Sequence, residues 1–210
     1  MIPRAYETGT CVFRGHSYSC ETGVFIPRPE TELLVDVALQ FRPEIILELG
    51  SGTGVISIEL SREFTDADVY SWDINPKAFA LAKKNDALSR VRFFLGDFFE
   101  AESIWRPLMD REVLFVSNPP YIPAGDIPTL DTSVKDFEPH TALDGGPDGL
   151  DYYRKLLTLF STFKKRPSMV FEIGIYQKKP LEKLLADLKY PDYKFFRDDQ
   201  DIPRILKISN

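Results

Sequence analysis

The chain has 210 residues, of which 43% are apolar and 28% are charged. This balance is typical of one folded domain, or of one domain with a small appendage, and excludes a disordered chain. Basic residues number 26 and acidic residues 32, so the net charge is −6, which disfavours stable binding to nucleic acid through its phosphates. No segment approaches the roughly 20 apolar residues of a membrane span, and the first residues lack the apolar run of a signal peptide. We therefore expect a soluble, cytoplasmic protein that is not bound to a membrane.

Cysteine and histidine are too few for a metal centre. The sequence has two of each, Cys11, Cys20, His16 and His140. A structural zinc site needs four such ligands, and these residues form neither a CxxC nor an HxxxH pair. The two histidines also lack a suitable Ser or Cys partner for a hydrolytic triad. We therefore expect chemistry that uses no metal ion.

The first predicted element is a β-hairpin over residues 10–21, with Gly15-His16 as its two-residue loop. This register pairs Cys11 with Cys20, with Cα atoms about 4.5 Å apart. In a cytoplasmic protein, we expect both cysteines to remain thiols. A Pro-Arg-Pro turn at 27–29 then leads into a helix with acidic residues in its first turn.

From residue 44 onward, short apolar runs alternate with amphipathic segments. This alternation predicts an α/β fold, with a mostly parallel sheet and helices on both of its faces. The predicted strands are 45–49, 68–73, 91–95, 113–117, 169–173, 193–197 and 204–208, and the predicted helices are 55–62, one beginning at Pro76, 150–163 and 177–188. The link 198–203 is too short for a parallel crossover, so the last strand should pair antiparallel. We divide the chain into an N-terminal hairpin and helix extension, residues 1–42, and a seven-stranded domain, residues 43–210.

One segment, residues 119–149, lies outside the alternation. It is rich in proline, contains Gly145-Gly146 and shows no clear periodicity. Loops of about thirty residues are uncommon in compact domains and are usually lids or binding segments. Because it begins at the carboxyl end of a strand, where open α/β sheets bind ligands, we expect it to serve as a lid.

A glycine-rich turn, residues 48–54 (ELGSGTG), joins the first strand of the sheet to a helix. Glycines allow positive φ angles and close approach to a ligand, and the helix N-terminus offers free N–H groups. The dinucleotide fingerprint would need glycine at position 55, where the chain has valine. Asp73 ends the next strand, where a carboxylate can bind both ribose hydroxyls, and Asp97 ends the third, where it could accept from an adenine amino group. The alternative is that the glycines only form a tight turn and the acids only end strands.

This arrangement resembles the class I S-adenosylmethionine-dependent methyltransferases over residues 44–210. The resemblance implies a Rossmann-like fold, S-adenosylmethionine as the cofactor and S-adenosylhomocysteine as its product. It places Glu48 near the amino-acid end of the cofactor, Asp73 at the ribose, and Asp97 with Phe98 at the adenine. The full set of cofactor-binding residues that it implies is Glu48, Gly50, Ser51, Gly52, Thr53, Gly54, Asp73, Asp97, Phe98 and Asn118.

The fourth strand ends in the sequence Asn118-Pro119-Pro120-Tyr121. Pro119 has no backbone donor, so its carbonyl and the side-chain oxygen of Asn118 leave two neighbouring acceptors. Two acceptors facing one point can hold an NH₂ group by both hydrogens and aim its lone pair at a methyl group on sulfur. Tyr121 can pack flat on a planar amide or base. The alternative is a turn that ends the strand, followed by a core tyrosine.

The motif resembles that of amino-methyltransferases that act on the planar nitrogen of adenine, guanine or a glutamine amide. The resemblance implies that Asn118, Pro119 and Tyr121 are catalytic. It also implies that the substrate is bound by these three residues together with Pro120.

Four further segments point to one of these substrates. They are 25–35 (FIPRPETELLV), 136–150 (DFEPHTALDGGPDGL), 171–174 (FEIG) and 201–205 (DIPRI). The first alone is only a turn and a helix start, but the four in this order resemble the HemK/PrmC family of glutamine-N5 methyltransferases. The resemblance covers residues 6–210. It implies methyl transfer to the glutamine amide in the Gly-Gly-Gln motif of a peptide chain release factor.

Two alternatives remain open from the sequence. Members of that family usually carry a helical N-terminal domain that helps to dock the release factor, yet only about 25 residues precede the Pro-Arg-Pro turn. Docking then uses the hairpin and lid, or a helper subunit, or the chain is truncated. The second alternative is a nucleic-acid amino-methyltransferase, N6-adenine or N2-guanine, with the same motif, although the chain shows neither a target-recognition segment nor a basic face.

Overall fold

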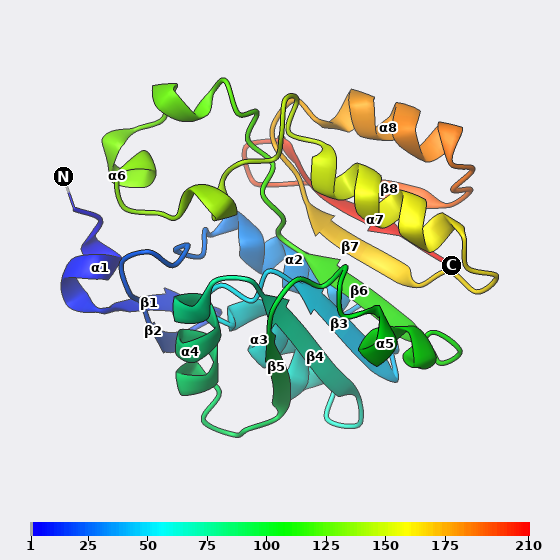
Figure 1. Ribbon diagram of the computed structural model, residues 1–210, viewed down its shortest axis with the longest axis horizontal. Coiled ribbons are helices and arrows are strands. Elements are labelled where there is room, and N and C mark those ends of the chain that lie inside the picture. The colour runs from blue at the N-terminus through cyan, green and yellow to red at the C-terminus, as the bar shows by residue number, and fades with distance from the viewer. Residues whose placement is uncertain (1) are drawn as a thin grey trace.

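The computed structural model describes residues 2–210. Its centre is a seven-stranded sheet with the order β5-β4-β3-β6-β7-β9-β8 (Figure 1). The strands are β3 (Ile45–Leu49), β4 (Asp68–Asp73), β5 (Val91–Leu95), β6 (Val113–Ser117), β7 (Ser168–Glu172), β8 (Tyr193–Arg197) and β9 (Pro203–Ile208). Strands β3 to β7 run parallel, while β9 lies between β7 and β8 and is antiparallel to both. The predicted mostly parallel sheet with an antiparallel last strand is confirmed.

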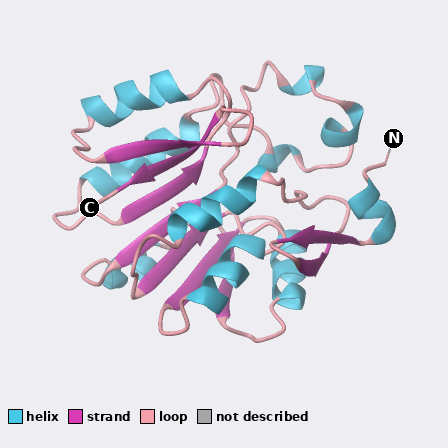
Figure 2. Cartoon of the chain, turned by 180° about the vertical axis from the view of Figure 1, so that it is seen from behind, coloured by secondary structure: helices cyan, strands magenta, loops and turns pink. Residues whose placement is uncertain are grey.

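Helices cover both faces of the sheet, one face in front in Figure 1 and the other in front in Figure 2. The long helices are α2 (Glu30–Ala38), α3 (Val55–Glu63), α4 (Pro76–Asn85), α7 (Asp151–Ser161) and α8 (Lys178–Asp187). Helices α2 and α3 pack on one face and α7 and α8 on the other. Successive strand residues point to opposite faces, so Ile46 lies in the first core and Leu47 in the second. Burial on both sides explains the unbroken apolar run of β3.

The N-terminal hairpin forms, but its predicted register is wrong. It consists of β1 (Thr10–Phe13) and β2 (His16–Ser19). The two-residue loop is Arg14-Gly15 rather than Gly15-His16, and Cys11 therefore faces Tyr18 instead of Cys20. Both cysteines are free thiols.

Contacts with α2 explain the observed loop. Arg14 and Gly15 both have positive φ angles, 48° and 78°, as a tight hairpin turn of this twist requires. The backbone N–H of Arg14 donates to Glu32 Oε1 at 2.8 Å, and its guanidinium contacts Asp36 at 2.5 Å. These contacts hold an arginine in a conformation that is otherwise rare for it.

The lid, residues 122–149, contains short helices that the sequence did not indicate. They are η2 (Ile127–Thr129), α6 (Thr132–Lys135) and η3 (His140–Ala142). Helices of three or four residues are too short to show periodicity. The lid lies beside the N-terminal extension: the Gly23 N–H donates to the Phe137 carbonyl at 3.1 Å, and Arg28 pairs with Glu138 at 2.6 Å (Figure 1).

Short helices complete the described chain. α1 (Arg4–Thr8) precedes the hairpin, and α5 (Glu102–Trp105) and η1 (Arg106–Leu108) follow β5. Within residues 2–210, no helix is long and apolar enough to cross a membrane. The same residues bring together no group of three or more His, Cys, Asp and Glu side chains that could hold a metal ion.

Candidate active site

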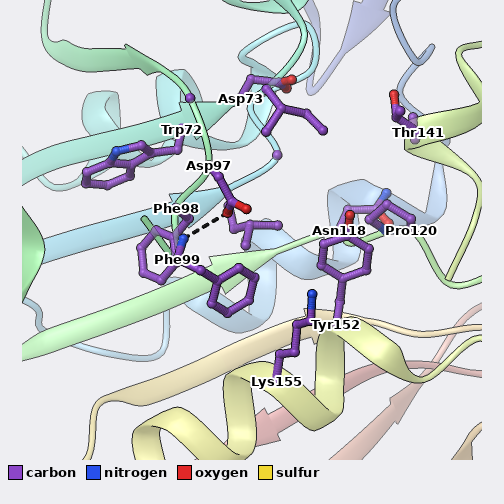
Figure 3. Close-up of a pocket in the computed structure, with 15 residues that line it drawn as sticks. Trp72, Asp73, Asp97, Phe98, Phe99, Asn118, Pro120, Thr141, Tyr152 and Lys155 are labelled. Carbon is purple, nitrogen blue, oxygen red and sulfur yellow. Dashed lines mark hydrogen bonds between the residues drawn. The ribbon is translucent and has the colours of Figure 1, made fainter. Parts of the chain in front are cut away.

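A cavity opens at the carboxyl ends of β3, β4, β5 and β6 (Figure 3). We call it the strand-end cavity. Open parallel sheets bind ligands at this edge. Its lining combines the strand ends with the lid and α7, and consists of Leu49, Gly50, Trp72, Asp73, Ile74, Gly96, Asp97, Phe98, Phe99, Asn118, Pro120, Thr141, Ala142, Tyr152 and Lys155.

The glycine-rich turn between β3 and α3 borders this cavity at Gly50. Gly52 and Gly54 have φ angles of 53° and 85°, which favour glycine. The Gly52 N–H donates to Asp73 Oδ2 at 2.8 Å and so ties the turn to the end of β4. A Cβ at Gly54 would lie 3.0 Å from the side chains of Ala82 and Ile58. Glycine at this position therefore also lets α3 and α4 pack closely.

The carboxylate of Asp73 lies at the end of β4 and borders the cavity. Its second oxygen, Oδ1, accepts from the backbone N–H of Asn75 at 2.8 Å. Burial raises the pKa of Asp73, and the two backbone hydrogen bonds oppose that rise. Because each carboxylate oxygen can accept more than one hydrogen bond, Asp73 can also accept from hydroxyl groups of a ligand.

Glu48 is buried beneath the turn and does not line the strand-end cavity. Its Oε2 accepts from the hydroxyl of Ser71 at 2.5 Å, and the Ser71 oxygen contacts the Ser51 hydroxyl at 2.7 Å. Its Oε1 has no hydrogen-bond partner among the described residues. Burial raises the pKa of Glu48 to about 8. Glu48 therefore reaches the turn through two serines rather than by its own carboxylate.

Asp97 and Phe98 follow β5 and differ in orientation. Asp97 Oδ1 accepts from the Phe99 N–H at 2.9 Å at the wall of the cavity (Figure 3). The ring of Phe98 is only 1% exposed and stacks on Trp105, with centroids 5.0 Å apart. The Phe98 ring therefore belongs mainly to the core.

Two side chains of α7, Tyr152 and Lys155, also line the cavity (Figure 3). Lys155 Nζ lies 5.5 Å from the centroid of the Phe99 ring. Burial and the nearby carboxylate of Asp97 raise the pKa of Tyr152. Sequence reasoning missed both residues because an amphipathic pattern does not distinguish a position beside a cavity from one at the surface.

A second cavity, the lid cavity, adjoins the first. It is lined by Phe25, Pro27, Thr31, Gly50, Ser51, Gly52, Thr53, Val55, Ile56, Asn118, Tyr121, Ile122, Ala142 and Leu143. Gly50, Asn118 and Ala142 line both cavities. A ligand in one cavity can therefore meet a group held in the other next to Asn118.

Asn118 and Tyr121 share a hydrogen-bond network beneath the lid cavity. Asn118 Nδ2 donates to Thr31 Oγ1 at 3.4 Å, and the Thr31 hydroxyl donates to Glu172 Oε2 at 2.7 Å. The Tyr121 hydroxyl donates to Glu172 Oε1 at 3.3 Å. Burial raises the pKa of Tyr121, which keeps the phenol neutral. No described residue donates to Asn118 Oδ1, so this oxygen is free to accept from a ligand.

Pro119 and Pro120, which lie between Asn118 and Tyr121 in the sequence, differ in position. Pro120 lines the strand-end cavity, whereas Pro119 is buried and lines neither cavity. No hydrogen bond among residues 2–210 ends on the Pro119 carbonyl. The next residue is fixed by Gln177, whose amide donates to the carbonyls of Tyr121 at 2.9 Å and Gly149 at 2.8 Å.

Thr31, Glu172 and Gln177 are site residues that sequence reasoning missed. One signal for Glu172 was present, since it ends an otherwise apolar strand, SMVFE. A carboxylate in a buried strand needs partners, and such groups are often functional. Thr31 and Gln177 carry no comparable signal, because their partners are 141 and 56 residues away.

Comparison with known proteins agrees with this geometry. A model described as a methyltransferase domain matches residues 42–111. The release factor glutamine methyltransferase of Geobacter sulfurreducens is 34% identical over 97% of this chain and 72% of its own length. That of Dictyoglomus turgidum is 38% identical over 90% of this chain and 68% of its own length.

The fold has a solved counterpart. The catalytic domain of human METTL16 in complex with a 3'UTR hairpin aligns with a TM-score of 0.69 at 14% identity, over 99% of this chain and 89% of that chain. This likeness supports the class I methyltransferase fold and nothing finer. The identity to the two curated relatives, by contrast, extends over more than two thirds of their length. The chain belongs to the family of release factor glutamine methyltransferases.

Proposed function

We propose that the chain transfers a methyl group from S-adenosylmethionine to the side-chain amide nitrogen, N5, of the glutamine in the Gly-Gly-Gln motif of a peptide chain release factor. When bound, S-adenosylmethionine would supply the methyl carbon. The bond from that carbon to sulfur would break with its electron pair going to sulfur, the amide nitrogen would form the new C–N bond, and one N–H proton would be released to water. The chain's own residues bind, orient and desolvate the two reacting groups.

The strand-end cavity fits the adenosyl part of this cofactor. Asp73 and Asp97 both line this cavity, so Asp73 would accept from the two ribose hydroxyls and Asp97 from the adenine amino group. Gly50 of the glycine-rich turn lines both cavities, so the turn would border the amino-acid part. Glu48 supports that turn through Ser71 and Ser51 rather than by direct contact.

The lid cavity fits a single extended glutamine side chain. Asn118 Oδ1 accepts one hydrogen of the target NH₂ group, and the Pro119 carbonyl accepts the other. These two bonds aim the nitrogen at the methyl group and stabilise the positive charge that develops on its hydrogens. Tyr121, with Pro120 beside it, packs on the flat face of the amide.

The observation that carries this proposal is the meeting of the two cavities at Asn118. Asn118 would hold the target nitrogen at this junction, while a cofactor bound at Asp73 would supply its methyl group from the strand-end cavity. A positioning acceptor at this junction matches the demands of a poor nucleophile such as an amide.

The test is methyl transfer from labelled S-adenosylmethionine to a release factor, to the same factor with the Gly-Gly-Gln glutamine changed to alanine, and to duplex DNA and RNA. We expect label on the unchanged factor alone. Equal labelling of both release factors would contradict the proposal. Labelling of nucleic acid instead would favour the alternative, an N6-adenine or N2-guanine amino-methyltransferase.

The lid, residues 122–149, is then the wall that faces the polypeptide. With a net charge of −6, the chain should bind its substrate without a strong phosphate contribution. We expect the affinity for the release factor to change little between 50 and 200 mM salt, a range over which duplex binders lose about 10³- to 10⁵-fold. A loss of that size would instead show that ionic contacts dominate binding to the release factor.

A further inference from the structure

A buried carboxylate lies beneath the lid cavity, outside the Asn-Pro-Pro-Tyr motif. Glu172 ends β7 and is 2% exposed. Its Oε2 accepts from the Thr31 hydroxyl at 2.7 Å, and its Oε1 accepts from the Tyr121 hydroxyl at 3.3 Å. The Tyr153 hydroxyl donates to its backbone carbonyl at 2.7 Å and fixes the end of the strand. Glu172 thus contacts elements that are far apart in the sequence.

The direction of these hydrogen bonds follows from the number of protons. A threonine hydroxyl has one proton, and Thr31 gives it to Glu172. The Thr31 oxygen can then only accept, so the group that Asn118 turns toward it must be the NH₂ end of its amide. The other end, Oδ1, points away from Thr31 and is the acceptor that a substrate NH₂ group needs.

If the hydrogen bond between Thr31 and Asn118 ran in the opposite direction, the Asn118 amide would be turned around. If Thr31 gave its proton to Asn118, then Asn118 Oδ1 would face Thr31 and its NH₂ group would face the substrate. Two NH₂ groups offer no acceptor to each other. The carboxylate of Glu172 prevents this arrangement because an ionised carboxylate only accepts.

We propose that Glu172 is a positioning residue for methyl transfer, which through Thr31 sets the end of the Asn118 amide that faces the substrate and through the Tyr121 hydroxyl holds the ring. This rests on the proposed function, since it assumes that Asn118 Oδ1 receives the target NH₂ group. Glu172 does not itself contact substrate or cofactor.

The surroundings of Glu172 make its charge state sensitive to pH. Burial raises its pKa to about 7, against the lowering effect of the Thr31 and Tyr121 hydroxyls. Glu30 on α2 raises the pKa further, and Arg204 on β9 lowers it. Tyr121 and Tyr153 are the other titratable groups that face it. Once protonated, Glu172 becomes a donor and no longer fixes the direction of the Thr31 hydroxyl.

The experiment compares Thr31→Val, Thr31→Ser and Glu172→Gln in release-factor methylation. Valine keeps the shape of threonine without its hydroxyl, so we expect kcat to fall at least about tenfold with little change in cofactor Kd. Serine restores the hydroxyl, so T31S should recover most of the kcat lost in T31V. Glutamine offers an acceptor to only one of the two hydroxyls, so E172Q should also lose kcat.

Three readouts separate positioning from a general loss of structure. The kcat of the wild type should fall as pH drops through about 7, and the kcat of E172Q should show no such fall. The double variant T31V/E172Q should have a kcat no lower than that of the less active single variant, because both changes break the same chain of hydrogen bonds. In NMR spectra, the Asn118 side-chain amide signals should move in T31V and stay in T31S.

Matched controls are Thr158→Val on the exposed face of α7 and Glu63→Gln at the exposed end of α3. Both should keep wild-type kinetics. A wild-type protein that does not methylate the release factor would contradict the proposed function. If the wild type is active, a normal kcat in T31V or additive losses of kcat in the double variant would overturn the positioning role of Glu172. The proposed function would then still stand.

Discussion

The two cavities of the site are built in different ways. The strand-end cavity consists mostly of residues at the ends of neighbouring strands, within 49–50, 72–74 and 96–99. The lid cavity instead draws on the N-terminal extension, the glycine-rich turn, the segment after β6 and the end of the lid. The first cavity therefore follows from the order of strands in a parallel sheet. The second requires segments more than 100 residues apart to meet, as Thr31 and Glu172 do.

The largest effect should come from the junction of the cavities. We expect Asn118→Ala to lower kcat by roughly 10²-fold or more, because the target nitrogen loses a positioning acceptor. Cofactor affinity should stay largely intact, since Asp73 and the glycine-rich turn are unchanged. Kinetics and calorimetry measure the two separately, with Asn210→Ala, an exposed position, as the control. Near-normal turnover would refute the role of Asn118.

The next effect isolates the strand-end cavity. Asp73→Ala removes charge-assisted hydrogen bonds to the ribose, each worth about 1.5–3 kcal/mol. It also removes the acceptor of the Gly52 N–H, so the turn loses its tie to β4. We expect the cofactor Kd to rise by about a hundredfold or more in calorimetry, with Asp66→Ala on the surface as the control. An unchanged Kd would show that the ribose assignment is wrong.

A smaller effect should separate the lid cavity from the strand-end cavity. Arg28 pairs with Glu138 of the lid at 2.6 Å, and the Glu138 side chain is only 1% exposed. Arg28→Met leaves that carboxylate buried without its cation, a costly arrangement that should loosen the lid. We expect KM for the release factor to rise about three- to tenfold with the cofactor Kd unchanged. Arg42→Met at an exposed position is the control. Equal changes in KM for the release factor and Kd for the cofactor would contradict the view that the lid acts on substrate binding alone.

The smallest effect concerns the stability of the protein and depends on Glu48, which is buried beneath the glycine-rich turn. Burial raises the pKa of Glu48 to about 8 from its ordinary 4.5, so the folded chain holds the proton more tightly than the unfolded chain. Its contribution to stability is therefore complete below about pH 4.5 and is lost as pH rises toward 8. Glu48→Gln cannot ionise, so its Tm should match the wild type near pH 5 and exceed it by a few degrees near pH 9. Parallel Tm curves for the two proteins would show that Glu48 does not titrate in this range.

The sequence predicted the sheet well because each strand is specified locally. The apolar run 45–49 and the turn after it indicate a buried strand and a ligand-binding edge without reference to distant residues. The hairpin shows the limit of such patterns. The two registers bury the same face, which carries Phe13 and Tyr18, so alternation could not distinguish them. The decision came from Glu32 and Asp36 on α2, through their contacts with Arg14.

The site shows the same division. Asp73, Asp97 and Asn118 all line the strand-end cavity, and the sequence indicated this position because each stands at or just after the end of a strand. It assigned Glu48 to the cofactor by resemblance, whereas the structure buries this side chain beneath the turn. No local pattern shows which of two faces a strand residue takes in a sheet that is covered on both sides. The partners of Asn118 likewise could not be predicted, because they depend on how α2 packs on β7.

The position of β9 between β7 and β8 has a consequence for how the protein is made. Ribosomes deliver the strands in chain order, so β7 and β8 emerge before the strand that joins them. Until β9 inserts, β7 has a bare edge and β8 has no partner, and the Ile173 N–H lacks the Arg204 carbonyl that it binds at 2.8 Å. Glu172 directly precedes Ile173 in the sequence. A growing chain in which β9 has not yet emerged can therefore form the glycine-rich turn but lacks the strand that pairs with β7 beside Glu172.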